Sequence, residues 1–100
     1  MKHALQHISL LTALLVALTL PVTANAADCF ADYKAKKDNP LRLHYGVVQL
    51  QNGCSAASAK SEVAERIKRD GWTLLNVLSI FDASELSGKD SSAGQFYLRY

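Results

Sequence analysis

The most chemically versatile side chains beyond position 26 are two cysteines and one histidine, Cys29, Cys54 and His44. Two thiols can form a disulfide, a redox couple or part of a metal site. A redox couple usually has the spacing Cys-x-x-Cys, whereas these cysteines lie about 25 positions apart. A structural zinc ion needs four ligands, and two cysteines and one histidine supply three. We therefore expect a structural disulfide, Cys29–Cys54, and neither a metal nor a cofactor. Free or intermolecular thiols are the alternative.

His44 is the candidate for general acid–base catalysis, because the ordinary pKa of histidine lies near neutrality. No serine or cysteine nucleophile stands at an informative spacing from it. We expect a hydrogen-bonded or surface histidine and assign no catalytic residue. Three carboxylates lie in a polar stretch that would hold them too loosely for catalysis: Asp82, Glu85 and Asp90.

Aromatic and cationic side chains gather at the end of the sequence, at Tyr97, Arg99 and Tyr100. Tyrosine and arginine are enriched in protein interfaces. A role for these three residues in an interface is therefore a hypothesis. Ordinary packing of a strand at the edge of a sheet is the alternative.

The first 26 residues have the three parts of a secretory signal. Lys2 gives a positive start, an apolar run extends over residues 8–20 and ends before Pro21, and Ala24-Asn25-Ala26 offers small residues for cleavage before Ala27. The apolar run would make a helix of about 20 Å, too short for about 30 Å of hydrocarbon. We expect a signal peptide at 1–26, a single domain at 27–100 without a stable membrane anchor, and a periplasmic or secreted location.

Composition excludes several classes of protein. The chain has 100 residues, of which 49% are hydrophobic and 20% charged, and its formal net charge is +2. Without the first 26 residues, ten Lys and Arg face nine Asp and Glu. Such a chain is too apolar to be disordered and too evenly charged to indicate binding to nucleic acid.

The spacing of apolar residues predicts a short helix at 28–38, a strand at 41–50, a helix at 55–70, and strands at 72–81 and 95–100. The main helix has Ser55 or Ser58 as N-cap, an apolar stripe, and solvent-exposed pairs such as Glu62–Arg66. Because the strand at 72–81 is apolar on both faces, we expect it to be buried on both. Residues 82–94 are predicted to form a loop.

These elements predict an α+β domain. A three-stranded sheet in the order strand-helix-strand-strand would carry one main helix on one face, with the short N-terminal helix beside it. The helical crossover makes the first two strands parallel. They either lie side by side or leave a slot for the C-terminal strand, and we favour the slot because an aromatic-rich strand gains two neighbours there. One helix covers one face only, so we expect the N-terminal segment to cover part of the other face and a protein partner or a second copy of the chain to cover the rest.

Residues 44–100 resemble a class of small bacterial domains of unknown function with a Gly-Trp junction between helix and strand. The resemblance lies in Tyr45-Gly46-Val47-Val48, Arg69-Asp70-Gly71-Trp72, Leu74-Leu75-Asn76-Val77 and Phe96-Tyr97-Leu98. The chain beyond the signal also resembles uncharacterised exported bacterial proteins with a cysteine near the N-terminus. Neither resemblance implies an activity or a site residue.

The sequence thus favours a small exported protein that acts as a non-enzymatic binding or interaction module. The alternatives are a small enzyme with a site near His44 at a dimer interface, and a structural subunit of the cell envelope.

Export predicts a defined N-terminus. We expect protein recovered from outside the cytoplasm of an expressing bacterium to begin at Ala27, because signal peptidase reads small residues at the −3 and −1 positions. N-terminal sequencing or intact mass measures this. A chain that begins at Met1, or far from Ala27, contradicts the prediction.

Overall fold

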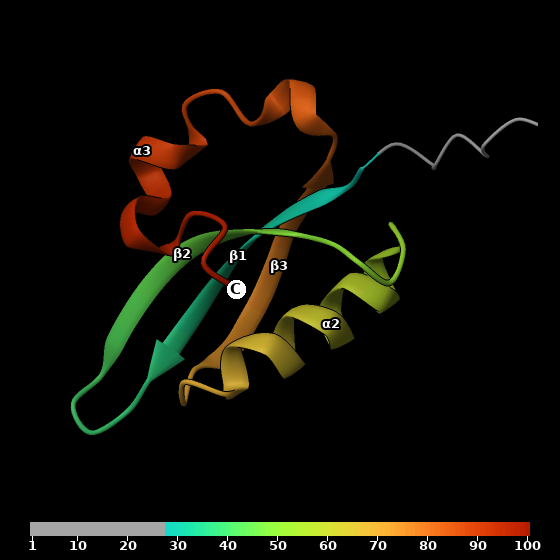
Figure 1. Ribbon diagram of the computed structural model, residues 1–100. Helices are drawn as coiled ribbons and strands as arrows, with labels where there is room; N and C mark the ends of the chain where they lie inside the picture. Colours follow the sequence, from blue (N-terminus) through green and yellow to red (C-terminus); the bar gives the residue numbers. More distant parts are fainter. Residues whose placement is uncertain (1–27) are drawn as a thin grey trace, which may run out of the picture.

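The computed structural model describes residues 28–100, so the predicted signal peptide and its cleavage site lie outside the described residues. Along the chain, the elements are β1 (Phe30–Lys37), β2 (Arg42–Gln49), α2 (Ala56–Lys68), β3 (Thr73–Phe81), the 3-10 helix η1 (Ala83–Glu85), α3 (Lys89–Ala93) and the 3-10 helix η2 (Gly94–Phe96) (Figure 1). Within residues 28–100, no helix is both long and apolar enough to cross a membrane.

The fold is α+β, with a three-stranded antiparallel sheet in the order β2-β1-β3. The helix predicted at 28–38 is wrong, since this segment forms the central strand β1. Phe30 and Tyr33 have helical spacing, but Ala31, Tyr33 and Ala35 point to one face of the sheet and are fully buried there. Pairing on both sides and this burial outweigh the local helical preference of alanine and lysine.

Two parallel strands have a third strand between them, as predicted, but that strand is β1 and not the C-terminal segment. β2 and β3 both run antiparallel to β1, which lies between them. Residues 95–100, predicted as a strand, form the end of η2 and an irregular tail that meets the outer edge of β2 through a bridge between Val47 and Tyr97. Leu98 has a φ of 54°, which interrupts an extended backbone. The stretch 82–94, predicted as a loop, contains η1 and α3.

Helix α2 packs against one face of the sheet, as predicted. Its N-cap is Ser55, whose Oγ accepts a hydrogen bond from the Ser58 N–H at 3.1 Å. The buried side of the helix carries Ala59, Val63 and Ile67. These residues share a core with Tyr33 and Trp72, among others, and the tryptophan is buried where the helix returns to the sheet.

The segment after β3 covers part of the opposite face. Phe30, Val47 and Phe81 form a second core there with Ala93 of α3. Figure 1 shows this segment arching over one end of the sheet, away from α2. The rest of that face stays open, and Leu43 on it is 66% exposed. The expected uncovered face is thus half covered by the chain itself.

The Cys29–Cys54 disulfide is confirmed. It joins the start of β1 to the connection before α2, with 5.8 Å between the two Cα atoms. The Leu50 N–H donates to the Cys29 carbonyl oxygen at 2.8 Å, so a hydrogen bond accompanies the covalent link. The bridge ties the central strand to the segment that leads into the main helix.

Loss of this disulfide is expected to lower the free energy of unfolding by about 3 kcal/mol, because a cross-link that closes a loop of about 25 residues restricts the unfolded chain. Urea unfolding of the oxidised protein and of the C29S/C54S variant, followed by the fluorescence of Trp72, measures the difference. Reduction of the unsubstituted protein is the control. A variant as stable as the oxidised protein contradicts the prediction.

Candidate functional site

The outer edge of β3 carries two of the exposed leucines of the sheet, Leu75 and Leu78. The prediction that this strand is buried on both faces is wrong, because β3 lies at an edge and pairs with β1 alone among the strands of residues 28–100. Over Thr73–Phe81 it carries no charged residue, no proline and no glycine. A strand buried on both faces needs a layer packed on each face, and in the described chain only Phe81 of β3 is buried.

Two irregularities in the pairing direct leucines outward. Between the pairs Asp32↔Ser79 and Tyr33↔Val77 the register skips Leu78, and between Lys34↔Asn76 and Ala35↔Leu74 it skips Leu75. The skipped residues are therefore the extra residues of two β-bulges. Bulges re-aim side chains at sheet edges. Leu75 and Leu78 are 49% and 43% exposed.

A groove runs between this edge and α2. One hollow of about 420 Å³ is lined by Ala56 and Lys60 of the helix and by residues 75–80. A second hollow of about 310 Å³ is lined by Lys60, Ala64 and Lys68 and by residues 72–74. Lys60 lines both hollows, so they follow one another along the strand. We call the two together the α2–β3 groove.

The helical wall of the α2–β3 groove repeats every four residues as alanine and lysine: Ala56, Lys60, Ala64 and Lys68. The alanines leave space, while the lysines place positive charge at the rim. No acidic side chain lines the groove. Within residues 28–100, neither lysine takes part in an ion pair. The groove is therefore an apolar surface depression whose two lysine side chains are available to a ligand.

His44 lies in an aromatic cluster on the α2 face. Its Nε2 is 2.9 Å from the Tyr33 hydroxyl oxygen, and its ring stacks on Phe96 with 3.6 Å between centroids and meets the Trp72 ring edge-on. The Tyr33 ring reaches it across Gly46, where a Cβ would collide with that ring. His44 is hydrogen-bonded, as expected, and 8% exposed.

Burial, with the nearby charge of Lys37 as a smaller cause, lowers the pKa of His44 to about 4. Burial also raises the pKa of Tyr33, with the charge of Tyr100 adding to the effect. Both groups are therefore neutral near pH 7. The Nδ1 atom of His44 is buried without a hydrogen-bond partner in the described chain. Within residues 28–100, its hydrogen-bond partner is the Tyr33 hydroxyl, and its aromatic surroundings make it part of the core.

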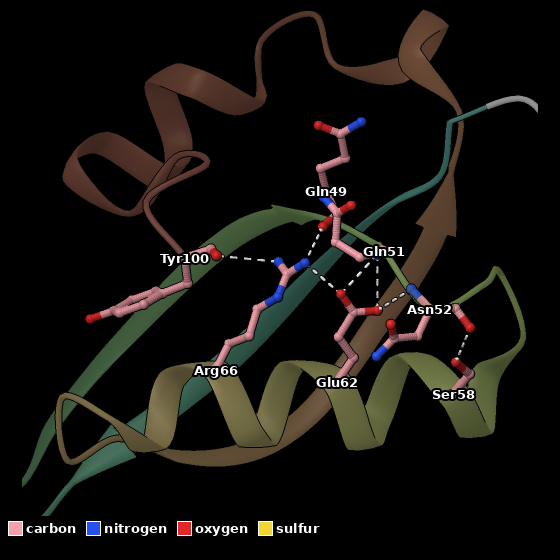
Figure 2. A network of polar contacts seen from close by, with 7 residues as sticks. All are labelled: Gln49, Gln51, Asn52, Ser58, Glu62, Arg66 and Tyr100. Atoms are coloured by element: carbon pink, nitrogen blue, oxygen red, sulfur yellow. Dashed lines mark hydrogen bonds and ion pairs between the residues drawn. The ribbon is translucent and has the colours of Figure 1, made fainter. Parts of the chain in front are cut away.

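A buried ion pair fastens α2 to the end of β2 and to the C-terminal tail (Figure 2). The Glu62 carboxylate accepts hydrogen bonds from the N–H groups of Gln51 at 2.8 Å and Asn52 at 2.9 Å. Arg66 pairs with Glu62 and donates to the main-chain oxygens of Gln49 at 2.8 Å and Tyr100 at 3.3 Å. The prediction that Glu62–Arg66 faces solvent is wrong, because both side chains turn to the main chain.

A second polar cluster lies under α3. Buried Asp32 accepts from Ser79 Oγ at 2.6 Å and from the Tyr45 hydroxyl at 2.9 Å, with Lys89 Nζ at 3.5 Å. Burial acts to raise the pKa of Asp32, but these hydrogen bonds and the charge of Lys89 bring it below its ordinary value. Burial and the hydrogen bond to Asp32 raise the pKa of Tyr45 to about 12. The cluster positions α3 through Lys89.

The three residues of the predicted interface are not gathered on one free surface. Tyr97 packs in the second core. The Tyr100 hydroxyl donates to Asp70 Oδ2 at 2.8 Å, and exposed Arg99 lies over the Tyr100 ring. The interface role of these residues stays a prediction, while the two tyrosines anchor the tail.

The three carboxylates of the stretch 82–94 are not brought together as a site. Asp82 caps η1 by accepting from the Ser84 N–H at 2.9 Å, and Glu85 and Asp90 are exposed. In the part of the chain that the structure describes, no group of three or more His, Cys, Asp and Glu is arranged to hold a metal ion.

Comparison of the chain with models of known protein families, with curated proteins and with solved structures finds no match. The resemblance to small bacterial domains with a Gly-Trp junction therefore stays a prediction. The site must be judged from its own geometry.

Sequence reasoning missed the four residues that give the groove its chemistry: Leu75, Leu78, Lys60 and Lys68. Two signals for them were present. The run 73–81 has apolar residues without alternation and without a charge, and alanine and lysine recur every four residues on α2. Neither signal shows by itself that the strand lies at an edge.

The pKa of His44 makes stability depend on pH. Unfolded chains protonate histidine near its ordinary pKa of 6.5, and the folded protein does so near 4. The unfolded state thus binds more protons between these values, so the free energy of unfolding should fall as the pH drops from about 6.5 to about 4.

Urea unfolding between pH 7 and pH 4 measures this, with H44F as the control that keeps a buried ring without the titrating group. The fall should be weaker in H44F. Protonation of Asp32 also lowers the free energy of unfolding, mainly below the ordinary pKa of 3.8 for this group. Equal pH dependence in both proteins contradicts the prediction.

Proposed function

We propose that the chain is an exported, disulfide-stabilised interaction module that binds an extended segment of another protein along the outer edge of β3. The observation that supports it is an uncharged nine-residue edge strand with two bulged leucines facing outward beside the α2–β3 groove. Strand addition supplies main-chain hydrogen bonds for affinity, and hollows beside the edge select alternate side chains of the segment.

The contrast between the two sheet edges supports this reading. The C-terminal tail lies along β2, and its Leu98 N–H donates to the Val47 carbonyl oxygen at 2.8 Å. Natural proteins usually protect an exposed edge with lysine, proline, a β-bulge or a covering segment. β3 has bulges but no charge or proline, and its bulges present leucine rather than a polar side chain. Such an edge suits a partner better than solvent.

Export is the second part of the proposal. The signal-like residues 1–26 and the disulfide both favour a periplasmic or secreted protein, because disulfides form and persist in oxidising compartments. The surroundings of His44 favour binding over the enzymatic alternative, since its ring is buried and neutral.

The proposal is tested with peptides selected from a random 12-residue phage library on the exported protein. Selected peptides should lose affinity for L78K by about tenfold or more, because a lysine at the bulge opposes an added strand. L41K is the matched control, since Leu41 is exposed at the turn between β1 and β2, away from the groove. Fluorescence anisotropy measures the affinities.

Peptides that bind the L78K variant as tightly as the unsubstituted protein contradict the proposal. So does a library that yields no binder.

A further inference from the structure

We infer that the segment bound in the α2–β3 groove alternates apolar and acidic residues, in the pattern apolar-x-acidic-x-apolar-x-acidic. This inference rests on the proposed function and names the chemistry of its partner. It is carried by the four-residue repeat of alanine and lysine on the helical wall of the groove.

The repeat of the helix matches the repeat of a strand. Four residues of an α-helix advance by about 6 Å, and two residues of a β-strand advance by about 6.6 Å. Side chains that alternate along an added strand therefore meet Ala56, Lys60, Ala64 and Lys68 in turn. Over the whole site the mismatch is about 2 Å, which the flexible stem of lysine can absorb.

The order of the two hollows shows in which direction α2 runs relative to β3. Ala56 and Lys60 line the hollow beside residues 75–80, and Ala64 and Lys68 line the one beside residues 72–74. The helix and β3 thus run past one another in opposite directions, as Figure 1 shows. Both lysines line the groove and lie about 12 Å apart along the helix axis, and strand residues four positions apart are about 13 Å apart.

Charge decides which residues belong opposite the lysines. The groove has two cations, no lining carboxylate and no ion pair at either lysine within residues 28–100. Carboxylates on the added strand would supply the missing partners. The alanines offer room rather than polar atoms, so the residues opposite them are apolar, with Val77 and Ile80 on the floor beside Ala56.

The same charges argue against a second copy of the chain as the occupant. Two β3 strands paired about a two-fold axis would bring the lysines of both copies to one joint groove without a carboxylate. Like charges placed together oppose association. A partner with acidic residues has no such conflict.

The test uses a labelled peptide, Val-Thr-Glu-Thr-Val-Thr-Glu with blocked ends, and fluorescence anisotropy with the exported protein. The Gln-for-Glu peptide is the first control. A peptide of the same composition with its two Glu residues two positions apart is the second. We expect the first peptide to bind most tightly, with a loss of up to about fivefold for each ion pair removed.

K60Q/K68Q should abolish the preference for Glu over Gln. K34Q is its matched control, since Lys34 is an exposed lysine of β1 that does not line the groove. All these side chains are on the surface, and thermal unfolding of each variant checks that the fold is retained. The preference should also shrink in high salt, because exposed ion pairs are screened.

The outcomes separate the inference from the proposed function. Equal binding of the Glu and Gln peptides, lost in both cases with L78K, overturns the acidic pattern and leaves strand addition standing. Binding of neither peptide, or binding unaffected by L78K, overturns both. A dimer of the unsubstituted chain in light scattering that disappears in L78K assigns the edge to a second copy and also overturns the inference.

Discussion

A three-stranded sheet has two edge strands with unpaired main-chain groups, and the described chain covers only one of them. The tail meets β2 through the Val47–Tyr97 bridge, and no segment of residues 28–100 does the same for β3. Because exposed edges invite pairing with other chains, an open edge must be protected or used. The bulged leucines and the groove beside them indicate use. The proposed addition of a strand to β3 depends on that asymmetry between the edges.

The buried polar groups explain why the tail lies along β2. Arg66 holds the main-chain oxygen of Tyr100 and Phe96 stacks on His44, both on the α2 face, while Tyr97 packs in the second core on the opposite face. Glu62 in turn pairs with Arg66 and accepts the N–H groups at the end of β2. Loss of one partner from such a network leaves a buried charge uncompensated. The network therefore maintains the closed edge as well as the attachment of α2.

How much could be predicted from the sequence depended on whether the signal was local. The helix around Val63 follows from a short-range pattern and was predicted correctly, and Ser55 is one of the two N-cap residues predicted for it. The Cys29–Cys54 bridge was also predicted correctly, because the part of the chain beyond position 26 has only these two cysteines. A short-range pattern does not show that residues 28–38 form a strand. Phe30 and Tyr33 have a spacing that suits a helix or a strand, and only the pairing with both neighbouring strands decides between them. The predicted strand at 95–100 took the central position that β1 occupies, although 72–81 was an edge strand in that order as well. The groove depends on the two bulges of β3 and on how α2 packs beside it, which the spacing of apolar residues does not show.

Amide hydrogen exchange along β3 tests the central claim most directly. In the free, monomeric protein, alternate amides of Thr73–Phe81 should exchange fast because they face outward, while those paired with β1 are protected. Addition of a bound peptide should slow the fast set and leave amides of β2 unchanged. Protection of every β3 amide in the free monomer, or no change on binding, would contradict the account.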